Sequence, residues 1–173
     1  MRGGDCHDDT VTDTPPLNPA WTVADVLMAA ARAGGSAAVI ARTVRDWAVP
    51  PNFGITVGTG RTYPSFTVRA GTAGAAGPRS PGILTLYADS HRSGPALEVR
   101  VNELCSTPPY DRQHARERLT ADLHALGIPR LEREDDLWRR RPEIPLGELT
   151  GGRAGQLLAL IDRWIGEVQA HHG

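Results

Sequence analysis

The chain has 173 residues, of which 40% are hydrophobic and 23% charged, and these values are typical of one globular domain. No apolar run approaches the roughly 18 residues that a membrane-spanning helix requires, so we expect no contact with a membrane. The formal net charge is −1, and all 19 basic residues are arginines. The absence of lysine excludes lysine-dependent phosphate loops, lysine Schiff bases and lysine general bases.

The charge and the cysteines also limit partners and location. A dedicated duplex-DNA binder usually carries a larger basic surplus, so nucleic acid is disfavoured, although a near-neutral domain can still have a basic face. The two cysteines, Cys6 and Cys105, are far apart and do not form a disulfide framework. Because the first residues contain no apolar segment typical of a signal peptide, we expect a cytoplasmic protein.

The chain divides into a short tail and one domain. Residues 1–20 are rich in Asp, Thr, Gly and Pro without any periodicity, and we interpret them as a disordered acidic tail. Residues 21–170 carry periodic apolar patterns throughout, which predicts a single folded domain.

The domain is expected to begin with two helices. Thr22 and Asp25 have the spacing of a capping box, and the helix that they start should end at Gly34-Gly35. Ser36 is expected to cap a second helix, which should end at Pro50-Pro51 because proline does not continue a helix. The apolar positions of this second helix are Ala37, Ile40, Val44 and Trp47.

The period then changes to two, which predicts strands. We expect four of them, around residues 55–57, 66–69, 82–88 and 96–101. The Gly- and Ala-rich residues 71–81 form a flexible loop and residues 89–95 a hairpin loop. Short connections between consecutive strands imply an antiparallel meander.

The rest of the domain is expected to be helical with one irregular stretch. Asp111 is predicted to cap a third helix, which ends at Gly127, and residues 128–150 are predicted to be irregular. The last helix, residues 153–170, has an apolar stripe of Leu157, Ile161, Trp164 and Val168. The predicted fold class is therefore α+β, with the order ααββββαα and helices packed on one face of a four-stranded meander.

Alternation in the strands predicts one apolar and one polar face of the sheet. Val101 and the apolar residues of the strands should face the helices. The polar face should show Thr56, Thr67, Arg69, Thr85, Tyr87, Glu98 and Arg100. Arg69, Tyr87 and Arg100 could form a nucleic-acid platform, in which cations contact phosphates and an aromatic ring stacks on a base. The alternative, which we favour, is an ordinary solvated face on which Glu98 is paired across the strands.

Two of these positions, together with Asp89 of the predicted hairpin loop, also raise the possibility of catalysis. Asp89, Glu98 and Arg100 resemble an acid…Glu-x-Lys nuclease site, in which two carboxylates hold Mg²⁺. Arginine stands where lysine is expected, however, and its permanent charge makes it a poor proton carrier. Asp89 is also an ordinary turn residue. A small metal-dependent nuclease therefore remains the alternative to a binding function.

Other charged or metal-binding side chains have simpler explanations. Arg139, Arg140 and Arg141 could hold a phosphate, but the acids just before them favour a solvated, salt-bridged segment. Cys6 and His7 could bind zinc together with His171 and His172, but the spacing is wrong and frayed termini are the better interpretation. We therefore expect no cofactor and no metal. Trp138 is interpreted as a buried anchor of the irregular segment.

Several short segments between residues 36 and 170 resemble a poorly characterised bacterial α+β domain. They are Trp47-Ala48, residues 82–87 and 97–101, Pro108-Pro109-Tyr110-Asp111, residues 141–146 with Leu149, and residues 160–165. Such domains occur alone or appended to nuclease modules of restriction and phage-defence systems. The resemblance implies an accessory role near nucleic-acid enzymes and transfers no catalytic residue.

The sequence thus favours a non-catalytic binding or accessory domain over an enzyme. The expected partner is a protein that the sequence does not identify, and the sequence does not determine the oligomeric state. The candidate binding residues are Arg69, Tyr87, Arg100, Arg139, Arg140 and Arg141.

Overall fold

The computed structural model describes residues 21–49, 53–58, 63–70, 81–90, 94–132, 137–139 and 141–172. The predicted tail of residues 1–20 and the predicted loop of residues 71–80 lie outside this part of the chain. The helices are α1 (Val23–Ala33), α2 (Ser36–Ala48), α3 (Val101–Leu104), α4 (Gln113–His124), α5 (Pro129–Glu132) and α6 (Gly151–His172), with the 3₁₀ turns η1 (Leu137–Arg139) and η2 (Leu146–Glu148). The strands are β1 (Phe53–Val57), β2 (Ser65–Ala70), β3 (Gly82–Ser90), β4 (Gly94–Val99) and β5 (Glu143–Pro145).

The predicted capping box at the start of α1 is confirmed. The Thr22 hydroxyl accepts a hydrogen bond from the Asp25 amide at 3.2 Å, and the Asp25 carboxylate accepts one from the Thr22 amide at 2.7 Å. This capping box satisfies amides that would otherwise have no partner at the start of α1. The helix ends at Gly34 and Gly35, whose positive φ angles of 75° and 58° suit glycine. Ser36 is the first residue of α2 and makes no side-chain cap, so its predicted role as a cap was wrong.

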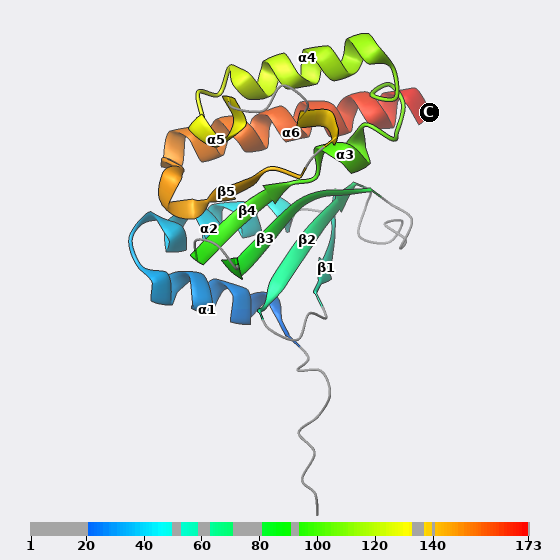
Figure 1. Cartoon of the computed structure of the whole chain (residues 1–173). Helices are drawn as coiled ribbons and strands as arrows, with labels where there is room; N and C mark the ends of the chain where they lie inside the picture. Colours follow the sequence, from blue (N-terminus) through cyan, green and yellow to red (C-terminus); the bar gives the residue numbers. More distant parts are fainter. Residues whose placement is uncertain are drawn as a thin grey trace, which may run out of the picture.

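The sheet has five antiparallel strands in the order β1-β2-β3-β4-β5 (Figure 1). The predicted α+β class and the antiparallel meander of the first four strands are confirmed. The prediction of only four strands was wrong, because residues 143–145 of the segment predicted to be irregular pair with β4. Ile144 is fully buried opposite Leu97. Burial of this single side chain, which no periodicity could reveal, holds β5 in place.

Three boundaries also differ from the predictions. β4 ends at Val99, so Val101 lies in α3 instead of a strand, although it is buried. Asp89 belongs to β3 instead of a hairpin loop. Arg112, not Asp111, precedes the first turn of α4.

In Figure 1, α1 lies below the strands, and α6 and α4 lie above them. α1 lies against β2, β3 and β4, while α2 contacts β1 and also packs against α6. α4 is tied to α6 by the ion pairs Arg163–Asp122 and Arg118–Glu167, the second at 2.5 Å. The described elements share one apolar core, in which Trp164, Tyr110 and Phe66 are the largest fully buried side chains.

Two tryptophans predicted to be buried have different environments. Trp164 is 1% exposed, as predicted. Trp47 is only partly buried, and its indole N–H donates to the Asp162 carboxylate of α6 at 2.9 Å. The side chain of Trp138 lies outside the described part of the chain. In that described part, no helix is both long enough and apolar enough to cross a bilayer.

Candidate binding surface

The polar face of the sheet is organised by one row of side chains that crosses all five strands. The register places Thr56 opposite Thr67, Thr67 opposite Thr85, Thr85 opposite Glu98, and Glu98 opposite Glu143. The hydroxyls of Thr67 and Thr85 are 3.0 Å apart and share a hydrogen bond. The row confirms that these side chains share one face, and only Thr85 among them is almost completely buried, at 2% exposure.

A charge cluster, defined here as Glu98, Arg100, Glu103 and Arg141, occupies the β4 side of this face. The Arg100 guanidinium forms an ion pair with Glu103 and lies 3.9 Å from the Glu98 carboxylate. Arg141 donates at 3.0 Å to Glu103 Oε1, the same oxygen that accepts from Arg100. Each arginine in the cluster therefore has a carboxylate beside it, and the cluster has no net charge.

The cluster sits directly above Gly82 at the start of β3. The Gly82 amide donates to Glu103 Oε2 at 2.7 Å. A Cβ at this position would meet Arg100 Nε and Glu103 Oε2 at 3.0 Å, which is closer than ordinary packing allows. Any larger residue at position 82 would therefore require Arg100 and Glu103 to shift by a few tenths of an ångström.

Tyr87 extends the cluster along β3. Its hydroxyl donates to Glu98 Oε2 at 3.3 Å. Burial raises the pKa of Glu98 above its ordinary value, although the positive charges of Arg100 and Arg141 oppose the shift. Burial also raises the pKa of Tyr87, and the negative charge of Glu98 adds to this effect. Glu98 Oε1 and Arg100 Nε are buried without a hydrogen-bond partner in the described residues.

The structure thus brings together four residues that the sequence singled out separately, namely Tyr87, Glu98, Arg100 and Arg141. Glu103, which bridges the two arginines, was missed. The available signal was its position three residues after Arg100, at the point where the strand ends.

The other predicted site residues lie elsewhere. Arg69 is on the β1 side of the polar face, where its Nε donates to the Thr56 hydroxyl at 3.2 Å. Asp89 lies four residues beyond Thr85, the partner of Glu98, which is roughly 13 Å along the strand. This spacing does not favour a magnesium ion shared by Asp89 and Glu98.

Arg139 lies in η1 and lines a hollow of about 370 Å³ together with Gln113, Arg116 and Glu117. Arg140 lies outside the described residues. Arg139 and Arg141 therefore belong to different groups of side chains, since Arg141 is part of the charge cluster.

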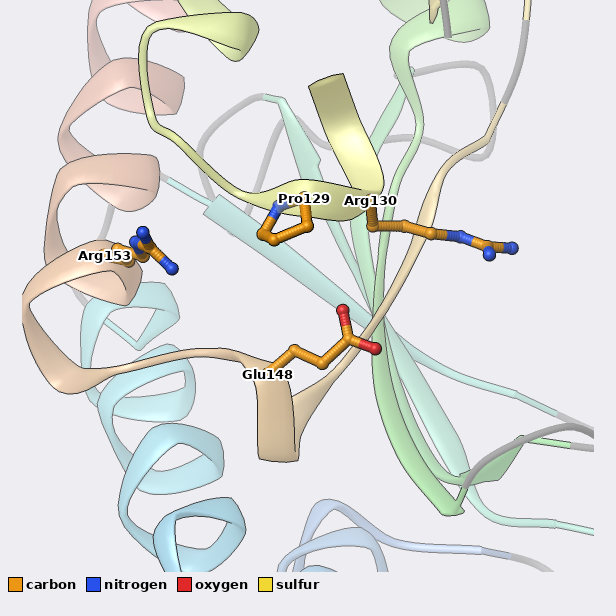
Figure 2. Close-up of a pocket in the computed structure, with 4 residues that line it drawn as sticks. All are labelled: Pro129, Arg130, Glu148 and Arg153. Atoms are coloured by element: carbon orange, nitrogen blue, oxygen red, sulfur yellow. The ribbon is translucent and has the colours of Figure 1, made fainter. Parts of the chain in front are cut away.

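A second hollow, of about 310 Å³, lies beside the start of α6 (Figure 2). Pro129, Arg130, Glu148 and Arg153 line it, and Figure 2 shows the Glu148 carboxylate between the two guanidinium groups. Both hollows are open to solvent, and no serine, threonine or cysteine is among the described residues that line them.

The remaining candidate groups are the metal-binding and nucleophilic side chains. The described residues contain no group of three His, Cys, Asp or Glu side chains that could hold a metal ion. Cys6 and His7 lie outside those residues, and His171 is exposed near the end of α6. Burial raises the pKa of the Cys105 thiol to about 11, so this thiol stays protonated at neutral pH.

The two edges of the sheet differ in their capacity to pair with another strand. Gly58 donates to Ser65 at 2.8 Å, and Ala88 donates to the Pro64 carbonyl at 2.9 Å. Since the hydrogen bonds of an antiparallel pair alternate, Gly54 and Thr56 bond to β2, and the N–H and C=O groups of Phe53, Ile55 and Val57 point away from the sheet. No strand in the described part of the chain pairs with this edge of β1.

The opposite edge is protected. β5 has three residues, and Val99 donates to the Pro142 carbonyl at 3.0 Å. The same alternation leaves Glu143 and Pro145 facing outward. Pro145 has no N–H to donate, and charged residues and prolines are common devices against edge pairing. β1 contains neither a charged residue nor a proline.

Comparison with known proteins identifies no relative of the chain: no family model, no curated protein and no solved structure matches it.

Proposed function

We propose that this chain is a non-catalytic binding domain that accepts a strand of another polypeptide at the open edge of β1. The observation that carries the proposal is the row of outward N–H and C=O groups on Phe53, Ile55 and Val57. Addition of a strand to such an edge is a recurrent mode of protein recognition, in which main-chain hydrogen bonds supply affinity.

The side chains beside this edge support a polypeptide ligand. Ile55 and Val57, on the apolar face, are only partly buried, whereas Phe66, Val68, Leu84 and Leu86 on the neighbouring strands are fully buried. An added strand would cover the two partly buried residues with alternate side chains of its own. On the polar face, Thr56 and Arg69 offer hydrogen-bond donors to the intervening side chains.

The charges of the polar face are less suited to nucleic acid or to catalysis. Arg69, Arg100 and Arg141 are balanced by Glu98, Glu103 and Glu143, so the face attracts no polyanion through net charge. Glu103 forms ion pairs with Arg100 and Arg141, and the Glu98 carboxylate lies 3.9 Å from Arg100, so these guanidinium groups would compete with a metal ion for both carboxylates. An accessory role beside a nucleic-acid enzyme is a further part of the proposal, and it rests on the sequence resemblance alone.

Photo-cross-linking tests the proposal in the cells that produce the protein. Thr56 is exposed at the edge, and its replacement by a photoreactive amino acid should yield a cross-linked polypeptide. The matched control carries the same amino acid at Gln169, an exposed position on α6. Val57→Pro removes an outward N–H and should abolish the product from position 56. The proposal would be contradicted if the yield of cross-linked product from position 56 equals that from position 169. It would also be contradicted if the product from position 56 persists in the Val57→Pro variant.

A further inference from the structure

The sequence of β1 is suited to pairing with itself. Its five residues, Phe53-Gly54-Ile55-Thr56-Val57, carry no ionisable side chain. Two copies of β1 can therefore lie side by side without the repulsion that arises when like charges lie directly opposite one another. The outward-facing residues at 53, 55 and 57 are also symmetric about Ile55.

We infer that the strand accepted by β1 is β1 of a second copy of this chain, antiparallel and related by a two-fold axis at Ile55. This inference rests on the proposed function, because it names the partner of the same edge. The resulting dimer has one continuous sheet in which the β1 strands of both copies are central.

The register follows from the alternation of hydrogen bonds. Phe53 lies opposite Val57 of the second copy, Ile55 opposite Ile55, and Val57 opposite Phe53. Each of these three pairs exchanges two main-chain hydrogen bonds, since all three residues direct both polar groups outward. A register shifted by one residue would place Gly54 or Thr56 opposite an outward-facing residue of the second copy. The N–H and C=O groups of Gly54 and Thr56 are already bonded to β2, so the hydrogen bonds between the two copies would be lost.

The side chains agree with this register on both faces. On the apolar face, the half-buried Ile55 of one copy covers Ile55 of the other, and Phe53, which is buried beside Trp47 of its own copy, lies opposite Val57. On the polar face, Gly54 lies opposite Thr56 of the second copy, so the exposed threonine meets no bulky side chain. Two-fold dimers of this kind are the commonest form of homo-oligomer.

The opposite edge of the sheet does not offer the same pairing. Two copies of β5 would place Glu143 beside an identical carboxylate and would lack the N–H of Pro145. Because β1 is short, the dimer is expected to be weak and to depend on protein concentration, as small interfaces are.

Sedimentation velocity of the full chain tests the inference. The 18.6 kDa chain should move from monomer to dimer as its concentration is raised roughly a hundredfold. Ile55→Lys places two like charges on the two-fold axis and should abolish the dimer, and Ile55→Glu should do the same. An equimolar mixture of the two variants should restore it, because lysine and glutamate then face one another. Val39→Lys, at a 61% exposed position on α2, is the matched control and should leave the dimer unchanged.

Hydrogen exchange provides a measurement that needs no substitution. The amides of Phe53, Ile55 and Val57 should become protected as the wild-type protein is concentrated, whereas those of Gly54 and Thr56 are already bonded to β2. A dimer that survives Ile55→Lys, or variants that do not restore each other, would overturn the inference. A wild-type chain that stays monomeric would also overturn it, yet cross-links from Thr56 to a different protein would still support the proposed function.

Discussion

At the scale of single residues, the polar face shows how burial and pairing determine what a charged side chain can do. The sequence offers Arg100 as a cation, but its guanidinium lies between the carboxylates of Glu98 and Glu103. Arg141 is similarly held by Glu103. A buried pair of this kind constrains geometry more than it adds stability, because desolvation offsets much of the attraction. These residues therefore define the end of the sheet, and they offer little free charge to a ligand.

Glu98 gives a prediction about pH. Burial raises its pKa in the folded state, so the folded protein binds the proton of Glu98 more tightly than the unfolded chain does. Protonated Glu98 therefore contributes to the free energy of unfolding. This contribution is complete below the ordinary pKa of glutamate and is lost as the pH rises through the raised pKa of Glu98 in the folded protein. Relative to Glu98→Gln, the wild-type protein should therefore lose free energy of unfolding between acidic and neutral pH.

Urea unfolding of both proteins over this range measures the difference. Gln169→Ala, an exposed change on α6 that removes no ionisable group, is the control and should run parallel to the wild type. A difference between wild type and Glu98→Gln that is constant with pH, or a wild-type protein that gains stability relative to Glu98→Gln toward neutral pH, would show that burial does not dominate the ionisation of Glu98.

Trp164 gives a prediction about packing. The side chain is 1% exposed, and its ring meets Tyr110 edge-on with centroids 6.5 Å apart. Trp164→Ala should lower the free energy of unfolding by about 3–5 kcal/mol, because it removes a large side chain from the core. Trp164→Phe should cost less, since the indole N–H has no hydrogen-bond partner among the described residues to lose.

Chemical denaturation of the two variants and of Gln169→Ala, an exposed change on the same helix, separates core packing from helix propensity. Equal losses for Trp164→Ala and Gln169→Ala would contradict the placement of Trp164 in the core.

At the scale of elements, local signals determined what the sequence could predict. The capping box of α1, the glycine stop after it and the alternation of β1 to β4 depend on neighbours within a few residues, and all were recognised. β5 was not, because a strand of three residues that ends in a proline has no period, and it forms only where Ile144 packs opposite Leu97 across the sheet. The charge cluster was likewise seen only in part, since Glu103 and Arg141 are brought together by the turn into α3 and by β5.

The capping box gives a prediction for α1. Thr22→Ala removes the hydroxyl that accepts from the Asp25 amide and should lower the free energy of unfolding by about 1 kcal/mol. Thr43→Ala is the matched control, because the Thr43 hydroxyl only donates to the Val39 carbonyl within α2 at 3.0 Å. That carbonyl keeps a partner in the helix, so the control should change stability little. Thermal unfolding that shifts equally for both variants would mean that the cap does not stabilise the domain.

At the scale of the whole molecule, the fold separates an apolar face, covered by α1 and α2, from a polar face whose charges are balanced (Figure 1). The two edges of the sheet also differ, since the β5 edge is protected against pairing with another strand and the β1 edge is open. The sequence predicted the two faces because alternation is local. It could not predict the open edge, because the order of strands in a sheet depends on which segments meet, and β5 was not recognised as a strand. The surface best suited to a partner therefore lies at the β1 end of the polar row and not among the charges on β4 and β5.

The balance of charge gives the last prediction. With a net charge of −1 and a polar face on which Arg69, Arg100 and Arg141 are matched by three glutamates, the wild-type protein should bind oligonucleotides weakly or not at all. Each phosphate contact made by a free cation steepens the dependence of affinity on salt by roughly 0.9 in the logarithmic slope, so the slope should stay below about one. Titration of single-stranded and duplex oligonucleotides at two salt concentrations measures it. Arg69→Ala is the variant of choice, because Arg100→Ala would leave two carboxylates without their cation and could unfold the sheet. A slope of several units in the wild type, reduced by Arg69→Ala, would instead place a nucleic-acid site on this face.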